Sequence, residues 1–569
     1  MAGGLLNLIA YGNENIILNG NPSKSFFKST YAAYTNYGMQ KFRIDQTGNK
    51  ELQLSQSTKF TFKILRYGDL LMDTYIVVKL PKIWSPIINQ DGNYTPYEFK
   101  WIKNIGCQLI KQITITIGGH VIQQYSGTYI QNMAQRDFDK NKIDMFNKMT
   151  GNTNQLNDPA NYLNNNGNYP NAINIKNIKT SETDPSGIIC SIEQQQLYIP
   201  LNCWFTLSSK MAFPLVALQY NELVIDIEFR PIYDMFVTRQ VDMDNYLESQ
   251  YNQDIPWVRP KENDDNYQFR RFINPPPKLD ISIHNETAYN NLPTNFNRYD
   301  VHLLCNYCFL DTEEQQIFAQ NDQRYLIKTI YEKEYDIKNS ASGKLLIESN
   351  GLVSNWMWYL QRSDVKLRNE WSNYTNYKYS DIIPNSIKRF NNNTYHNIDK
   401  YTDNSINIYC TGDYPSQFQD SNVKYILDRF AIICDGKYRE NELDIGVYNL
   451  LEKYARTNGN SENGLYCYNF AINSDPYSQQ PSGAFNTNRF KTIEFEYRFN
   501  QREVIGQTLA PLDLSGSNVK TVCDADTDII IEVKDATNVF QYYYKLYLME
   551  ERYNVLEFKS GYADLQFSR

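Results

Sequence analysis

Residues 211–223 read MAFPLVALQYNEL and run directly into VIDIEF at residues 224–229. Four apolar residues share one face of the second part: Leu223, Ile225, Ile227 and Phe229. Polar residues alternate with them, and this period of two predicts a β-strand with one buried and one exposed face. The proline and small residues before it predict a buried turn that feeds the strand.

The same alternation recurs along the chain and indicates an all-β protein. The other expected strands are residues 113–117, 303–310, 325–331, 493–499, 528–533 and 542–548. Gly118-Gly119 predicts a tight hairpin, because glycine adopts the positive φ that such turns need. Helix signals are few. The best begins at Asp311, an expected N-cap with Glu314 three residues on, as in a capping box. We predict a short helix there, linking two strand-rich halves.

Length and composition favour several ordinary globular domains. The chain has 569 residues, of which 41% are hydrophobic and 21% charged, and it is too long for one compact core. Its 46 tyrosines and recurrent Asn-rich stretches suit strands, turns and contact surfaces. A weak internal echo pairs residues 117–120 with 434–437, and 204–229 with 469–499. One repeat per roughly 250 residues suggests duplication of a whole sandwich domain.

Net charge, cysteine usage and the absence of long apolar runs indicate which partners and which cellular compartment to expect. The formal net charge is −8, from 56 basic and 64 acidic residues without a long basic run, so we expect no direct nucleic-acid contact. Nine cysteines are scattered singly, which indicates buried thiols in a reducing compartment. The first residues lack a basic region and a cleavage pattern, and no apolar run approaches about 18 residues. We therefore expect no secretory signal and no membrane span, and a soluble protein made in the cytoplasm.

One spacing superficially suggests zinc. His302, Cys305 and Cys308 give H-x2-C-x2-C. On a strand, however, the side chain at 305 points away from those at 302 and 308. Buried thiols in an apolar strand are therefore favoured over a metal site.

Three further patterns also have simple structural interpretations. The acidic residues Asp524, Asp526 and Asp528 imitate the start of a calcium loop without its later Gly and Glu, so a solvated acidic turn is favoured over incidental calcium. Residues 480–483 (QPSG) lack a nucleophile elbow and a nearby His, which favours a turn. Trp356 and Trp358 are expected in a core or interface, with a sugar-stacking platform as the alternative. We assign no catalytic, cofactor-binding or metal-binding residue.

Five ordered blocks span nearly the whole chain. They are GGL, AYG, LNGNP, FFK and TNY within residues 3–37; RYGDL at 66–70; residues 214–223; FLDTEE, FAQ and YLI within 309–327; and QPSG, YNVL and SG at 480–483, 553–556 and 560–561. Together they resemble the double jelly-roll major capsid proteins of nucleocytoplasmic large DNA viruses, of the algal and amoebal giant-virus type.

The resemblance implies an all-β chain of two tandem eight-stranded jelly-roll sandwiches, with long loop insertions and a short linking helix. The implied parts are an N-terminal arm (1–27), a first roll (28–310, with insertions about 131–195 and 231–297), a linking helix (311–323) and a second roll (324–569). It implies a non-enzymatic subunit whose homotrimers form pseudo-hexagonal capsomers tiling an icosahedral shell. Implied partners are neighbouring capsomers, minor capsid and penton proteins and, through minor proteins, an internal viral membrane. The implied location is the virion shell, after synthesis and assembly in the host cytoplasm.

Two expectations concern surfaces. Four apolar residues of the arm have no obvious core: Leu5, Leu6, Leu8 and Ile9. We expect them to contact neighbouring shell proteins on the interior side, with packing under their own roll as the alternative; deleting residues 2–20 should then spare trimers but block shells. Polar segments 152–177, 231–297 and 372–415 are expected as surface excursions on the outer face or trimer seam.

A second class of function stays open at this stage. A jelly roll can also bind or process carbohydrate, which needs a groove with exposed aromatics and, for hydrolysis, a pair of carboxylates. No spacing in the chain marks such a pair. A sugar-binding monomer would favour this class, and a trimer silent on a glycan array would favour the capsid subunit.

Overall fold

The structure of the protein is a computed structural model. The structure describes residues 3–48, 50–90, 93–163, 165, 169–173, 188–240, 257, 259–260, 269–277, 284–292, 300–337, 342–363, 365–376, 425–500, 520–523, 530–533 and 543–567. The predicted turn with Asp524, Asp526 and Asp528 lies outside these residues, as does most of the polar segment 372–415.

Two antiparallel sheets form a first unit. One sheet has the order β1-β12-β3-β8 and the other the order β2-β10-β6-β7. The strands are β1 (Tyr37–Asp45), β2 (Thr58–Lys63), β3 (Leu70–Leu80), β6 (Ile110–Ile117), β7 (His120–Tyr125), β8 (Gln195–Pro200), β10 (Leu223–Phe229) and β12 (Val301–Leu310). Strand β10 alternates buried and half-buried residues throughout, which confirms the prediction for residues 223–229.

A second unit repeats this arrangement. Its sheets have the orders β13-β23-β15-β18 and β14-β20-β16-β17. The strands are β13 (Gln323–Ile337), β14 (Ser342–Ile347), β15 (Leu352–Arg362), β16 (Leu427–Cys434), β17 (Lys437–Asp444), β18 (Tyr466–Asn469), β20 (Ile493–Phe499) and β23 (Tyr544–Lys559). Strands β13 and β23 pair along 15 residues and extend well beyond the predicted 325–331 and 542–548.

The two units match strand for strand in sequence order. Both place the first strand beside the last in one sheet, and in both the fourth and fifth strands form a tight hairpin in the other sheet. The hairpin β6–β7 turns at Gly118-Gly119, with φ of 55° and 89°, and β16–β17 turns at Asp435-Gly436, with φ of 48° and 75°. The internal echo noticed in the sequence therefore corresponds to equivalent turns and equivalent strands.

Residues 213–217 in the first unit and residues 485–489 in the second form equivalent turns. Short strand β9 (Phe213–Pro214) pairs with β3, and the 3-10 turn η5 (Leu215–Ala217) leads toward β10. In the second unit β19 (Phe485–Asn486) pairs with β15, and η14 (Thr487–Arg489) leads toward β20. The predicted buried turn before a strand is confirmed, and it joins the two sheets of each unit.

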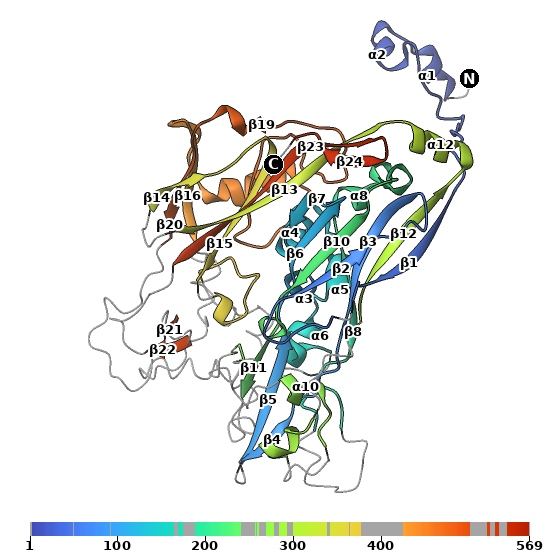
Figure 1. Ribbon diagram of the computed structural model, residues 1–569. Helices are drawn as coiled ribbons and strands as arrows, with labels where there is room; N and C mark the ends of the chain where they lie inside the picture. Colours follow the sequence, from blue (N-terminus) through green and yellow to red (C-terminus); the bar gives the residue numbers. More distant parts are fainter. Residues whose placement is uncertain are drawn as a thin grey trace.

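A projection extends from the first unit. Strands β4 (Ile87–Gln90), β5 (Asn93–Trp101) and β11 (Phe236–Gln240) form a three-stranded sheet, joined by α10 (Phe269–Ile273). Its core is aromatic, with the Phe99 ring stacked on Phe236 at 4.8 Å. Part of the predicted 231–297 insertion thus pairs with β5. Figure 1 shows this projection at the opposite end of the molecule from helices α1 (Leu5–Ile9) and α2 (Ile16–Asn19).

The remaining elements connect these parts. They are α3 (Ile105–Leu109), α4 (Gly127–Asp137), α5 (Lys140–Thr150), α6 (Asn154–Asn157), α8 (Trp204–Leu207), α11 (Glu286–Tyr289), α12 (Thr312–Gln320), α16 (Glu452–Arg456), η1 (Asn13–Asn15), η2 (Pro159–Asn161), η4 (Ser209–Met211), η6 (Ile232–Asp234), η9 (Val365–Leu367), η13 (Val447–Leu451), β21 (Lys520–Cys523), β22 (Ile530–Val533) and β24 (Tyr562–Leu565). The predicted linking helix is α12. Helices α4 and α5 were not predicted.

Candidate functional site: the seam between the two units

Helix α4 lies at the boundary between the units and all of its residues are buried. Ser126 caps it, because its Oγ accepts a hydrogen bond of 3.1 Å from the backbone N–H of Tyr129. The helix contains buried amide and charged side chains, and such groups destabilise a fold unless they find partners. Those partners come mainly from the second unit.

Arg136 of α4 is the centre of a buried ionic cluster. Its Nε and Nη2 donate to the carboxylate of Asp137 at 2.9 and 2.6 Å. The same Nη2 donates to Glu551 Oε1 at 2.7 Å, and Nη1 donates to Asn355 Oδ1 at 2.9 Å. Glu551 and Asn355 lie on β23 and β15, so one guanidinium joins the first unit to two strands of the second. Asn355 Nδ2 completes the loop by donating to Glu551 Oε2 at 2.8 Å.

Further donors satisfy both carboxylates. The Tyr129 hydroxyl donates to Glu551 at 2.9 Å, and Lys328 Nζ lies 3.8 Å from the same carboxylate. Ser474 Oγ donates to Asp137 at 3.0 Å. The cluster contains two cations and two anions and its charge is balanced. A fully satisfied buried network of this kind favours one relative orientation of the parts that it joins.

The cluster also changes the acidity of Glu551. Burial alone would raise the pKa of this carboxyl, but the positive charges of Arg136 and Lys328 outweigh it and lower the pKa to about 2. Burial raises the pKa of Asp137, although Arg136 opposes that shift. Glu551 therefore stays ionised to a lower pH than Asp137, and it holds Arg136 across the seam.

A second contact fixes the start of α4. Both the backbone N–H and the Oγ of Ser126 donate to the carboxylate of Glu332, each at 2.7 Å. Glu332 lies on β13, so the second unit caps a helix of the first. Burial raises the pKa of Glu332 to about 7, and the two hydrogen bonds from Ser126 limit the rise. This carboxyl changes its charge near neutral pH.

Aromatic side chains from both units pack beside the ionic cluster. The Phe213 ring meets Phe558 edge-on at 5.4 Å, and Trp204 lies 5.9 Å from Tyr325. Phe558 and Tyr325 belong to β23 and β13, and one continuous cluster of buried apolar residues runs from the first unit into these strands. The turn that directs β10 therefore also holds the second unit.

The same turn makes a close backbone contact with the end of the chain. The Tyr220 ring stacks on Tyr562 at 5.2 Å, and the Tyr220 N–H donates to the carbonyl of Gly561 at 3.2 Å. Gly561 has φ of 82°, and a Cβ at this position would lie 2.8 Å from the Tyr220 ring. Glycine is needed here for both reasons.

The linking helix begins where the sequence places it. Asp311 is the residue before α12, and its Oδ1 accepts from the backbone N–H of Thr312 at 2.8 Å. Glu314 lies in the first turn, where a negative charge favours the helix N-terminus. One carboxylate oxygen of Glu314 has no hydrogen-bond partner in the described structure, and no capping-box bond back to Asp311 is formed there.

Asp69, from the RYGDL block, holds this helix against the first unit. Its two carboxylate oxygens accept from the Leu310 N–H at 2.9 Å and from Gln315 Nε2 at 2.7 Å. Leu310 ends β12 and Gln315 belongs to α12, so one side chain sets the angle between strand and helix. The neighbouring Gly68 lies so close to Tyr307 that a Cβ would come within 3.1 Å of it.

The N-terminal arm lies apart from both units. Its four predicted contact residues, Leu5, Leu6, Leu8 and Ile9, are 46%, 58%, 76% and 63% exposed. No residue of α1 or α2 is buried, and Figure 1 shows both helices projecting beyond α12. The alternative of packing under the arm's own roll is therefore wrong for this conformation.

The sequence is similar to major capsid proteins along a length that includes both units. A family model described as the N-terminus of the major capsid protein matches residues 25–265. The major capsid protein of Phaeocystis pouchetii virus is 24% identical and covers 91% of this chain and 97% of its own length. That of Paramecium bursaria Chlorella virus 1 is 23% identical over the full length of both chains. The similarity to these two proteins extends along almost the whole chain and therefore covers both units.

Solved structures show the same fold. A chain of the PBCV-1 virus capsid superposes with a TM-score of 0.57 at 18% identity, covering 96% of this chain and 100% of its own. The Faustovirus major capsid protein gives 0.55 at 12% identity, with coverage of 94% and 93%. The predicted resemblance to the double jelly-roll major capsid proteins of large DNA viruses is confirmed. Its two pairs of antiparallel sheets are the two rolls, which confirms the predicted fold class.

In the rolls, the residues of the superficial zinc spacing point to different sides of β12. Cys305 belongs to the main core, whereas Cys308 packs with Leu70 and Ala212 in a separate small cluster. His302 Nδ1 lies 3.2 Å from Asp300 instead. Within the described ranges no group of three or more His, Cys, Asp or Glu side chains is placed to hold a metal ion.

The other candidate residues are parts of the fold. Trp356 and Trp358 are fully buried in the core of the second roll, so they do not form a sugar-stacking platform. Ser482 accepts from the N–H of Asn473 and donates to its carbonyl, both at 3.1 Å, which makes residues 480–483 a structural turn. No helix in the described part of the chain is long and apolar enough to span a membrane.

Sequence reasoning missed helices α4 and α5 and, with them, the seam. Local signals were present: Ser126 and Asp139 accept N-cap hydrogen bonds, and Gly151 ends α5 with φ of 78°. Asp139 accepts from the N–H of Lys142 at 2.9 Å. No local signal, however, pairs Arg136 with a carboxylate 415 residues away.

Proposed function

We propose that this chain is the structural subunit of an icosahedral virus shell, in which three copies form a pseudo-hexagonal capsomer. The observation that supports this most is the pair of matching rolls held together by the buried Arg136–Glu551 cluster. Three rigid pairs supply six similar sandwiches, and a threefold ring of them presents nearly six equivalent sides to its neighbours.

The proposed mechanism is burial at interfaces, without catalysis. A closed trimer repeats one heterologous interface three times, so one face of the first roll meets a different face of the second roll in the next copy. Lateral contacts between capsomers can each be weak, because the lattice repeats them many times. The location of the protein is the virion shell, and we propose synthesis and assembly in the host cytoplasm.

The shape of the chain suggests how it is oriented in the shell. The projection of β4, β5, β11 and α10 lies at the end opposite to the arm (Figure 1). We propose that the projection points outward and the arm (residues 1–27) points inward, toward minor capsid and penton proteins and, through minor proteins, an internal membrane. The proposed division then continues with the first roll (28–310), the linking helix (311–323) and the second roll (324–569).

Native mass spectrometry of the purified full chain tests the trimer. The proposal expects a stable trimer at micromolar concentration, and a chain that stays monomeric would contradict it. A variant lacking residues 2–20 tests the arm, since it should form the same trimer but fail to build shells with the other shell proteins. Normal shells from this variant would contradict the role of Leu5, Leu6, Leu8 and Ile9.

A further inference from the structure

Within one chain, the second roll covers the turn that joins the two sheets of the first roll. Phe213 of β9 is fully buried, and its ring meets Phe558 edge-on at 5.4 Å. Phe558 is the last residue but one of β23, the last of the eight paired strands of its roll. Leu218, the residue directly after η5, is buried as well. One strand end of the second roll thus packs on the turn of the first.

The equivalent turn of the second roll is more open. Phe485 of β19 takes the place of Phe213, because β19 pairs with β15 as β9 pairs with β3. Phe490, the residue directly after η14, takes the place of Leu218. Phe485 and Phe490 are half-buried, whereas Phe213 and Leu218 are 0% and 1% exposed. Apolar surface that is open in one repeat and covered in the other indicates an interaction site.

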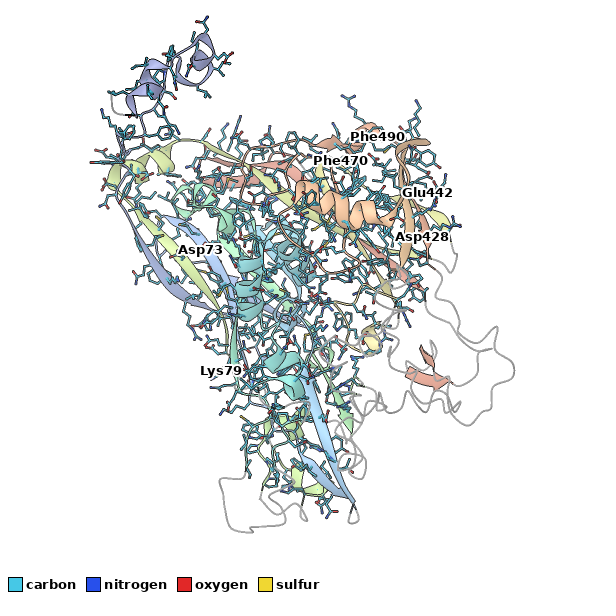
Figure 2. All side chains as sticks on the ribbon, turned by 180° about the vertical axis from the view of Figure 1, so that it is seen from behind. Asp73, Lys79, Asp428, Glu442, Phe470 and Phe490 are labelled. Carbon is cyan, nitrogen blue, oxygen red and sulfur yellow. The ribbon has the colours of Figure 1, made fainter. Side chains whose placement is uncertain are left out.

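Three stacked phenylalanine rings form this open surface, and we name them the phenylalanine ladder. The Phe485 ring lies 4.7 Å from the Phe470 ring and 4.9 Å from the Phe490 ring, with 9° and 21° between the ring planes. Figure 2 shows Phe470 and Phe490 close together on the second roll. Ile472, two residues after Phe470, is 69% exposed and extends the apolar surface.

The first roll has an open counterpart of Phe558. Phe309 is the last residue but one of β12, as Phe558 is of β23. Phe309 pairs with Gly38 on β1, and a Cβ at Gly38 would meet no atom within 4 Å. Phe309 is 36% exposed, whereas Phe558 is 1% exposed. The first roll therefore exposes the same kind of strand end that the second roll uses to cover the turn.

The helices that follow the fifth strand of each roll differ in the same way. In the first roll α4 follows β7, and all of its residues are buried at the seam. In the second roll η13 and α16 follow β17. Leu450, Leu451 and Tyr454 of this helical stretch are 63%, 61% and 92% exposed. The second roll is thus open at two elements whose counterparts in the first roll are covered.

A ring of alternating rolls accounts for these differences. In such a ring, the contact between two copies occupies a place equivalent to the contact between the two rolls of one chain. A closed ring uses a heterologous interface, which joins two different surfaces of successive copies. In Figure 1, β1 and β12 lie on the side of the molecule that carries the arm, and β19 lies on the second roll toward the other side.

We propose that the phenylalanine ladder of one copy packs on the end of β12 in the next copy, where Phe485 meets Phe309 as Phe213 meets Phe558 within the chain. The same sheet of the next copy covers Leu450, Leu451 and Tyr454, as the second roll covers α4. This inference rests on the proposed trimer and names the two surfaces of its interface.

Photo-crosslinking tests the contact directly. Benzoylphenylalanine replaces Phe309 in full-length chains, and trimers are prepared from a mixture of isotopically light and heavy copies. We expect crosslinks between light and heavy copies, into residues 470–490. The matched control places the probe at Met145 on α5, which is 58% exposed and should not react with these residues.

The failure of the contact and the failure of the trimer give different results. Intact trimers whose Phe309 probe reacts only within its own chain, with another surface or not at all would overturn the contact alone. A chain that stays monomeric would overturn the trimer as well.

Substitutions give a second test. Phe309→Ser and Phe485→Ser should each raise the trimer dissociation constant roughly tenfold or more, because buried aromatic residues dominate interfaces. The double variant should add little, since both changes remove the same contact. Leu346→Ser, at a position 56% exposed on β14, is the control and should leave the constant unchanged. An unchanged constant for Phe309→Ser, which alters a side chain already exposed in the single chain, or fully additive losses would contradict the proposal.

Discussion

Replacing Glu551 with Gln tests the seam that holds the rolls together. The change keeps the size of the side chain but removes one of the two negative charges in the cluster. Arg136 Nη2 and the Tyr129 hydroxyl lose a charged acceptor at 2.7 and 2.9 Å. Asp137 is then the single carboxylate beside Arg136 and Lys328, and the cluster is left with a net positive charge in a buried position.

The expected loss is large for a single substitution. Removing one partner of a buried ion pair destabilises a protein by about 3–5 kcal/mol. For 569 residues unfolding together, an unfolding entropy of about 2.1 cal/mol/K per residue converts this loss into a fall of about 2.5–4 °C in melting temperature. The folded-state pKa of Glu551 is lowered to about 2, so its contribution to stability is fully present above pH 4.5 and is lost as pH falls toward 2. The Glu551→Gln variant should lack this pH-dependent contribution to the free energy of unfolding.

Differential scanning calorimetry and chemical denaturation measure the effect. Glu557→Gln is the matched control, because Glu557 lies on the same strand but pairs with Arg324 at a surface where the arginine is 68% exposed. Such a pair contributes at most about 1 kcal/mol. Adding Arg136→Met to Glu551→Gln should restore charge balance, so that the double variant is more stable than the sum of the single losses. Equal small effects of the Glu551 and Glu557 substitutions would refute the reasoning.

Two further predictions concern the same boundary. The pKa of Glu332 is raised to about 7, so the folded state holds this proton more tightly than the unfolded state does. The free energy of unfolding should therefore fall by at most about 3 kcal/mol as pH rises from about 4.5 to 7. Glu332→Gln should flatten this pH dependence in denaturation curves, and an unchanged slope would contradict the assignment. Gly561→Ala should destabilise the chain by roughly 1–3 kcal/mol in the same assay, because the new Cβ meets the Tyr220 ring and φ is positive. Gly119→Ala, with positive φ and no atom within 4 Å, should lose only about 1 kcal/mol, and equal losses would show that the Tyr220 contact does not matter.

Strands were predictable where one face is buried and the other is exposed. Residues 223–229 and 493–499 show this alternation in the sequence and in the structure. The turn at Gly118-Gly119 was predictable because its backbone requires positive φ. The internal echo followed from the same signals, since equivalent strands of the two rolls carry equivalent patterns.

The seam was not predictable by the same means. Helix α4 has apolar residues on one face, but its polar residues, which the sequence alone would place in solvent, are buried as well. In the sequence, Arg136 cannot be distinguished from a surface arginine, because its partner Glu551 is distant along the chain. The assembly surfaces were not predictable either. Exposed residues such as Phe27 show no periodicity, and their role depends on the partner that they contact.

A cryo-EM reconstruction of the purified full-length protein tests the central claim most directly. The account predicts a particle with threefold symmetry, in which six sandwich densities form a ring and each chain of 66.7 kDa contributes two adjacent ones joined at α4. Single chains, or two rolls whose relative orientation varies from particle to particle, would contradict it.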